Sequence, residues 1–291
     1  MNTSLDCIPC ILRQTLEAAR VASSDPAEHE AFLREVLTWA GIMDLRQSPP
    51  AITQQIHHRL REISGKDDLY RAVKDRQNLM AMDMLPDLSA RVKAAKNPLL
   101  MSARLAIAGN IIDLGVNGKL TEADVHLALK QALTEPLSGD PDRFQTAVRE
   151  AHSILYLADN AGEIAFDRLL IEQILPKRVT LAVRGAPAIN DATCEDARQV
   201  GLDQMVEVIG NGSDAPGTIL SDCSPEFYSR FRQADLIIAK GQGNFETLCD
   251  EPGNIFFLFK VKCPLVSELV HQPVGSHMLV RSRGTQGELA G

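Results

Sequence analysis

The stretch SILYLADNAGEIAFDRLLIEQIL, residues 153–175, decides the fold of this chain. A short apolar run ends in a polar turn, and from Glu163 the apolar residues recur at helical spacing. The same pattern returns, with helical stretches between the runs, in VTLAV (179–183), MVEVIG (205–210), DLIIAK (235–240) and NIFFLFK (254–260). Strands that alternate with helices predict a parallel sheet covered on both faces. We therefore expect a doubly wound α/β architecture with a mostly parallel sheet.

The chain before residue 135 or so is predicted to be helical instead. Apolar residues recur every three to four positions in the segments 10–22, 30–42, 51–64 and 69–95. Pro26, Pro49-Pro50, Gly65 and Asn97-Pro98 separate these segments. We expect a helical N-terminal region at residues 1–100, packed on an α/β/α domain at residues 101–291.

Composition excludes several classes of function. The 291 residues carry a formal net charge of −8, whereas a nucleic-acid-binding face is usually basic. The sequence has neither an apolar stretch of membrane-spanning length nor an N-terminal secretory pattern, so we expect a cytoplasmic protein that contacts neither membrane nor nucleic acid. Six cysteines are too few for a disulfide framework in a chain this long. Protein partners are not indicated.

Polar residues follow three of the predicted strands. They are Asp159, Asn160 and Glu163 after the first, Arg184, Gly185, Asn190 and Asp191 after the second, and Lys240 and Gly241 at the third. In open α/β sheets ligands bind beyond the carboxyl ends of the strands, so these side chains are expected to meet. Carboxylate and amide oxygens suit a divalent metal, and cations beside them suit a phosphate. Helix capping by each aspartate is the alternative.

Three of these segments, LADNAGE (157–163), RGAPAIND (184–191) and KGQGNFE (240–246), together resemble the metal-dependent damage-control phosphatases, a family first catalogued as a domain of unknown function. CIPC (7–10), GKDDLYRAVKDRQN (65–78) and AGNIIDLG (108–115) extend the resemblance over nearly the whole chain. The N-terminal Cys-x-x-Cys is similar to that of the mainly prokaryotic branch. The resemblance implies a Rossmann-like α/β/α sandwich that hydrolyses small phosphorylated metabolites, such as sugar phosphates or damaged cofactor precursors.

The resemblance also implies a set of site residues. The metal ligands are expected at Asp159, Asn160 and Asp191, for Mn²⁺, Mg²⁺, Co²⁺ or Ni²⁺. Substrate contacts are expected from Asn110, Arg184, Gly185, Lys240 and Gly241. The metal would neutralise charge on the phosphoryl group and orient an attacking water. Asp113 or Glu163 would orient that water or protonate the leaving oxygen, and the sequence does not choose between them.

Two other functions remain open from the sequence. One is an S-adenosylmethionine-dependent carboxyl methyltransferase, although the loop at 159–163 has a single glycine where that cofactor usually meets several. The other is a metal-dependent protein that binds a phosphorylated ligand without turning it over. Cys7 and Cys10 open a predicted helix, where they could be metal ligands, redox thiols or packed side chains.

Overall fold

The structure is a computed structural model that describes residues 1–109, 125, 127, 129–130, 133–174 and 178–284. Its helices are α1 (Cys7–Ala22), α2 (Pro26–Ala40), α3 (Pro49–Ser64), α4 (Arg71–Ala94), α5 (Pro98–Ala108), α8 (Pro141–Glu150), α9 (Glu163–Gln173), α10 (Cys194–Gln199), α11 (Pro225–Gln233), α12 (Gly241–Leu248) and α13 (Pro264–Val270). Its strands are β1 (Leu137–Gly139), β2 (Ile154–Leu157), β3 (Val179–Val183), β4 (Glu207–Gly210), β5 (Leu236–Lys240), β6 (Ile255–Lys260) and β7 (His277–Arg281). In this part of the chain no helix combines the length and apolar character of a membrane span.

The described strands form one sheet in the order β1-β7-β6-β5-β2-β3-β4. Strands β2 to β6 are mutually parallel, whereas β7 runs antiparallel to β6 and pairs in parallel with β1. The chain passes from β2 to β3 and β4 on one side, then returns to place β5 on the other side of β2. The carboxyl ends of β2 and β5 therefore flank a switch point, where a ligand crevice is expected.

Both faces of the sheet are covered, as the strand sequences predict. In β2, Ile154 and Tyr156 belong to a core that includes residues of α4, α5 and α9, while Leu155 and Leu157 belong to a second core with residues of α11, α12 and α13. Side chains of successive strand residues point to opposite faces, so one apolar run supplies both cores. The prediction of an α/β fold with helices on both faces is confirmed.

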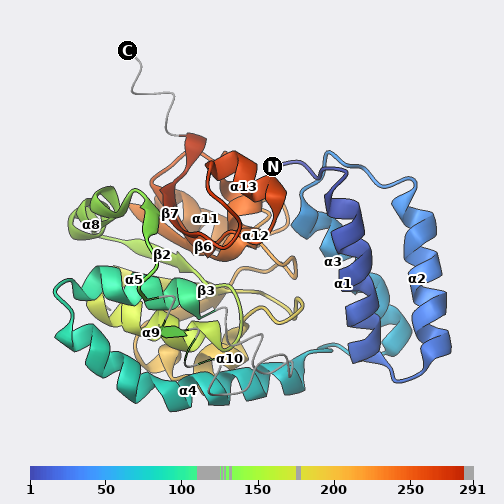
Figure 1. The fold of residues 1–291 in the computed structure, drawn as a ribbon, viewed down its shortest axis with the longest axis horizontal. Helices are drawn as coiled ribbons and strands as arrows, with labels where there is room; N and C mark the ends of the chain where they lie inside the picture. The colour runs from blue at the N-terminus through green and yellow to red at the C-terminus, as the bar shows by residue number, and fades with distance from the viewer. Residues whose placement is uncertain (110–124, 126, 128, 131–132, 175–177, 285–291) are drawn as a thin grey trace.

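Helices α1, α2 and α3 form a separate layer at the side of this sandwich (Figure 1). They share their own apolar cluster, which includes Ile11, Phe32 and Ile56. Helix α4 leaves this layer and runs under the sheet, where Met84 and Leu88 join the core of α5 and α9. Helices α4 and α5, on either side of residue 100, both contribute to the core that covers this face of the sheet. The domain boundary predicted at residue 100 remains a prediction.

Candidate active site

The loop after β2 is joined by its backbone to the loop that carries Asp191. Asn160 and Asp191 form an isolated antiparallel bridge. The N–H of Ala161 donates to the Asn190 carbonyl at 2.8 Å, and the N–H of Ala192 donates to the Asp159 carbonyl at 2.8 Å. These contacts fix Asp159, Asn160 and Asp191 beside one another, as the sequence predicts for residues at adjacent strand ends.

Asp159 and Asp191 are both buried. Burial, together with the nearby charges of Glu163 and Asp191, raises the pKa of Asp159 well above its usual range. Burial also raises the pKa of Asp191, although the Arg184 guanidinium opposes it. Two buried carboxylates that repel each other are stabilised when a cation binds between them.

The donor set fits a hard divalent metal ion, which prefers oxygen ligands. Asn160 Nδ2 donates to Asp159 Oδ2 at 2.9 Å, which directs the amide nitrogen away from the role of ligand and leaves the amide oxygen for a cation. Among the described residues no three His, Cys, Asp or Glu side chains are grouped as a metal site. The residues that could hold a cation here are the two carboxylates and the amide, with water or substrate oxygens completing its coordination.

The two cations predicted to contact phosphate lie in buried ion pairs. Arg184 is 3% exposed, and its Nε donates to Asp191 Oδ2 at 2.6 Å. Lys240 is fully buried, and its Nζ lies 2.6 Å from Glu163 Oε1. Arg184 and Lys240 therefore lie beside the other predicted site residues. Each one is paired with a carboxylate, Asp191 or Glu163, at the position where a phosphate contact was predicted.

The remaining predicted residues are placed as follows. Gly241 packs its backbone against the Asp159 carboxylate, so closely that a side chain on it would collide with all three carboxyl atoms. Gly185 donates its N–H to Asn211 Oδ1 at 2.9 Å and to the Ser213 carbonyl at 2.8 Å. Asn110 and Asp113 lie outside the described residues.

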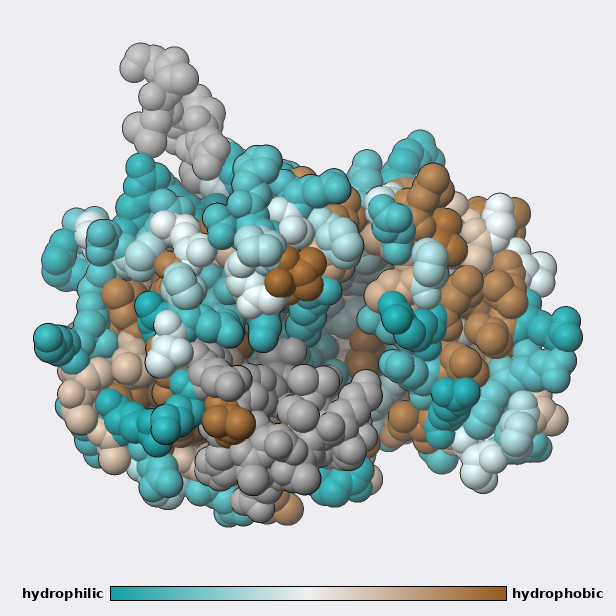
Figure 2. All heavy atoms as spheres, in the orientation of Figure 1, coloured by the Kyte–Doolittle hydropathy of each residue, from teal (hydrophilic) through white to brown (hydrophobic). Residues whose placement is uncertain are grey.

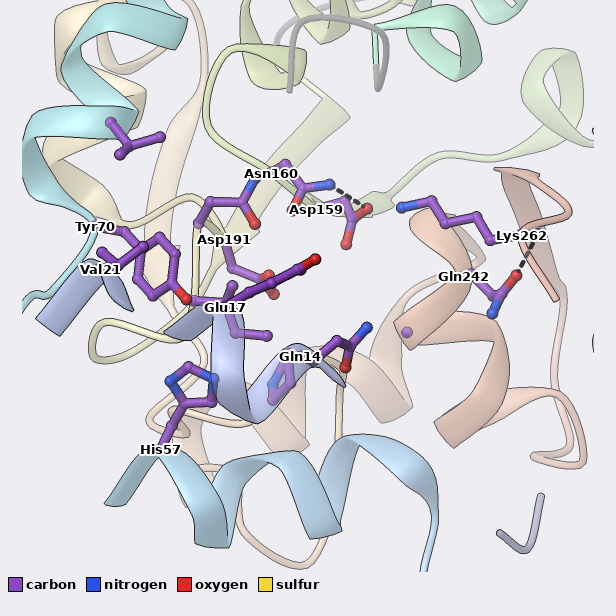
Figure 3. Close-up of a pocket in the computed structure, with 15 residues that line it drawn as sticks. Gln14, Glu17, Val21, His57, Tyr70, Asp159, Asn160, Asp191, Gln242 and Lys262 are labelled. Atoms are coloured by element: carbon purple, nitrogen blue, oxygen red, sulfur yellow. Dashed lines mark hydrogen bonds between the residues drawn. The ribbon is translucent and has the colours of Figure 1, made fainter. Parts of the chain in front are cut away.

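A cavity of about 440 Å³ opens in front of Asp159, Asn160 and Asp191. The α1–α3 layer forms its opposite wall and contributes Gln14, Glu17, Val21 and His57, while Tyr70, Gln242 and Lys262 complete much of the lining. Figure 3 shows Glu17 directed toward the carboxylates from one side and the Lys262 ammonium directed toward Asp159 from the other.

Figure 2 shows hydrophobic side chains gathered over the outer surface of this helical layer.

Lys262 was not among the predicted site residues. It is exposed, lies two residues beyond the end of β6, and its positive charge opposes the rise in the pKa values of Asp159 and Asp191. Like Asp159, Lys262 follows the carboxyl end of a parallel strand, where ligands bind in open α/β sheets, so the same rule could have identified it. For Glu17 and His57, by contrast, no motif links the helical segments to the strand ends.

The helical layer is fixed to the sheet-side loops by Asp214, which follows β4. Gln54 Nε2 donates to Asp214 Oδ1 at 2.6 Å, and His58 Nε2 lies 2.6 Å from Asp214 Oδ2. Arg61 pairs with the same carboxylate and donates to the Pro187 carbonyl at 3.0 Å. The cavity is therefore bounded by two parts of the chain that are held together by charged contacts.

Cys7 and Cys10 lie in the first turn of α1 and line a second cavity of about 240 Å³ together with Cys263. All three are free thiols. Cys263 Sγ accepts a hydrogen bond from Gln242 Nε2 at 3.5 Å, and Gln242 also lines the larger cavity.

Comparison with known proteins identifies the family to which this chain is similar. Residues 3–278 match the family model described as the damage-control phosphatase ARMT1-like domain. A damage-control phosphatase of Archaeoglobus fulgidus is 34% identical, with 94% of this chain and 97% of that protein covered. A damage-control phosphatase of Pyrococcus horikoshii is 32% identical over 97% of this chain and 99% of its own. The crystal structure of a P. horikoshii protein from the DUF89 family superposes with a TM-score of 0.87 at 31% identity, covering 97% of this chain and 100% of the other.

Proposed function

Because this chain belongs to the damage-control phosphatase ARMT1-like family, we propose that it is a metal-dependent phosphatase acting on phosphate monoesters of small metabolites. The observation that carries the proposal is the meeting of Asp159, Asn160 and Asp191 at the wall of the 440 Å³ cavity. That volume suits a small ligand, and sugar phosphates or damaged phosphorylated metabolites are the class we propose.

Asp159, Asn160 and Asp191 would hold the divalent ion, with Mn²⁺, Mg²⁺, Co²⁺ or Ni²⁺ as candidates. When bound, such an ion supplies Lewis acidity and neutralises charge at the phosphoryl group. Helices α9 and α12 begin next to these residues, and the N-terminus of a helix favours negative charge. Phosphate binding at this edge of the sheet is supported by both features.

Lys262 is the cation that we propose for the phosphoryl oxygens, since it is exposed and directed into the cavity. The direct phosphate contacts expected of Arg184 and Lys240 stay predictions, and their buried ion pairs favour a different role. Arg184 would hold Asp191 in place. The choice between Asp113 and Glu163 as the group that orients water stays open.

The test is turnover of a panel of phosphorylated sugars and p-nitrophenyl phosphate by metal-stripped protein, with and without added Mn²⁺, Mg²⁺, Co²⁺ or Ni²⁺. We expect activity to require the metal and to fall at least 100-fold in Asp159→Asn and Asp191→Asn, because each loses an ionised ligand. Asp203→Asn, at an exposed position outside the cavity, serves as the control. Metal-independent turnover, or full activity in Asp159→Asn, would show the assignment to be wrong. Binding of inorganic phosphate without turnover of any ester would favour the non-catalytic alternative.

A further inference from the structure

Beneath the cavity, the Lys240 ammonium is surrounded by three acceptors. Nζ donates to the Ala106 carbonyl at 2.7 Å, to Glu163 Oε1 at 2.6 Å and to Asp167 Oδ1 at 2.9 Å. A lysine ammonium has three protons to donate. These contacts use all of them, so a phosphoryl oxygen could gain a hydrogen bond from Lys240 only if one of the three were broken.

The contacts of Lys240 continue in two directions. Toward the cavity, Glu163 Oε2 accepts from Asn160 Nδ2 at 3.4 Å. Toward the core, Asp167 Oδ1 accepts from the Tyr156 hydroxyl at 2.8 Å. All five side chains are buried, so this series of contacts lies in an environment of low dielectric, which strengthens hydrogen bonds. This series of contacts links Asn160, a proposed metal ligand, to Tyr156 in the centre of β2.

The orientation of the Asn160 amide depends on this series of contacts. Its Nδ2 donates to two carboxylates, Asp159 Oδ2 at 2.9 Å and Glu163 Oε2 at 3.4 Å. Two acceptors on the nitrogen side set which way the amide faces, and the oxygen is then turned away from them. If Glu163 moved, one of the two would be lost and the amide could rotate.

Asp167 contacts Lys240 on the side away from the cavity, between Lys240 and Tyr156. Its Oδ2 is buried and has no hydrogen-bond partner among the described residues, while Oδ1 serves both Tyr156 and Lys240. Burial raises the pKa of Asp167 to about 6, and the Lys240 charge opposes this effect. Burying a carboxylate is unfavourable unless it is paired with a cation or a hydrogen-bond donor, and Lys240 is the cation that Asp167 contacts.

We infer that Lys240 and Asp167 are positioning residues, which hold Glu163 under Asn160 so that the amide oxygen faces the site metal. The inference rests on the proposed function, because it takes Asn160 as a ligand. It differs from the expectation that Lys240 contacts phosphate. A positioning residue acts on metal affinity, whereas a phosphate contact acts on substrate binding, so the two roles can be separated by measurement.

The experiment is calorimetric titration of metal-stripped protein with Mn²⁺ alone, followed by kcat and KM for p-nitrophenyl phosphate at saturating Mn²⁺. We expect Asp167→Asn to weaken Mn²⁺ binding about 10-fold, the lower end of the range for loss of a group that orients a ligand. Its KM at saturating metal should change less than about twofold. Lys240→Met should show the same separation with a larger loss of metal affinity.

Glu172→Gln, an exposed change on the same helix α9, is the matched control and should leave both quantities unchanged. Tyr156→Phe removes only one hydroxyl and keeps the inference testable if Lys240→Met does not fold. Its loss of the hydrogen bond to Asp167 should weaken Mn²⁺ binding by a few-fold. Unchanged Mn²⁺ affinity in Asp167→Asn, with a raised KM in Lys240→Met, would overturn the inference in favour of a phosphate contact.

The titration does not depend on turnover, so the two proposals fail in different ways. If the parent binds Mn²⁺ and Asp167→Asn weakens that binding, the inference stands even when no tested ester is hydrolysed. If the parent binds no Mn²⁺, Asn160 is not a ligand and the inference is wrong. If the parent turns over esters but Asp167→Asn binds Mn²⁺ normally, the proposed function survives and the inference does not.

Discussion

Replacing Gly241 by alanine should displace Asp159 and so weaken metal binding. Gly241 has φ +79°, and a Cβ on it would fall under 3.0 Å from Oδ1, Cγ and Oδ2 of Asp159, whereas ordinary Cβ contacts lie at 3.4–4 Å. Because the whole carboxyl group is too close, rotation of its end cannot relieve the collision. The carboxylate must leave its place in the site.

Two costs of this substitution can be separated. An alanine held in the left-handed region costs about 1–2 kcal/mol, which lowers the melting temperature by roughly 2 to 8 °C in a chain of this size. Displacement of Asp159 should in addition weaken Mn²⁺ binding roughly 10- to 100-fold, equivalent to about 1.4–2.8 kcal/mol. The first cost concerns the stability of the fold, and the second concerns only the site.

Gly65 provides the matched control. It has φ +64° at the end of α3, and nothing lies within 4 Å of a Cβ placed on it. Gly65→Ala should therefore show the loss of melting temperature without a change in Mn²⁺ affinity, as measured by differential scanning calorimetry and by titration. If Gly241→Ala bound Mn²⁺ within twofold of Gly65→Ala, the role of Asp159 as a ligand would be refuted.

Three further perturbations follow from the site. Lys262→Ala should raise KM for phosphate esters about 10-fold with Mn²⁺ affinity little changed, since a charge-assisted contact with the phosphoryl group is lost; Lys93→Ala, an exposed lysine outside the cavity, is the control in the same steady-state assay. Burial, aided by the charge of Arg61, lowers the pKa of His57 to about 4, so the unfolded chain takes up a proton near pH 6.5 before the folded one does. Stability should be fully present above pH 6.5 and fall by about 3 kcal/mol toward pH 4, and urea unfolding of His57→Gln should show less of this fall. Asp214→Asn should weaken attachment of the α1–α3 layer by about 1–3 kcal/mol, seen as faster amide hydrogen exchange in α3, and unchanged exchange would contradict the structural role of this carboxylate.

Much of the sheet could be predicted because its strands carry a local signal. Strands β2, β3, β5 and β6 are short apolar runs that are largely buried between helices on both faces of the sheet, and such runs can be recognised without knowledge of the fold. Strands β1 and β7 were not predicted. They lie at one side of the sheet, with β7 antiparallel to β6, so they interrupt the regular alternation of strand and helix on which the prediction depended.

The meeting of Asp159 and Asp191 could be predicted for a similar reason. Asp159 and Asp191 lie in loops that follow adjacent parallel strands, and parallel neighbours bring such loops to the same edge of the sheet. The contacts of Arg184 and Lys240 could not be predicted in this way. Whether a cation faces a cavity or a carboxylate depends on the packing of α9 and α12 against the strands, which sequence spacing does not specify.

The charge balance of the site explains why those two cations are buried. Four buried carboxylates, Asp159, Glu163, Asp167 and Asp191, lie near Arg184 and Lys240, which leaves this group of six with an excess of two negative charges when all are ionised. The buried Lys74 nearby is paired with the buried Asp196. A buried charge without compensation is costly, so Arg184 and Lys240 are needed where they are.

A divalent cation would remove this excess, and the group of six would then be close to neutral overall. An incoming phosphate dianion would need positive charge from outside this balanced set. Lys262, which is exposed and directed toward Asp159, and the N-termini of α9 and α12 are placed to supply it. On this reasoning, the proposed role of the buried cations is to support the metal ligands, and that of the exposed lysine is to bind the substrate.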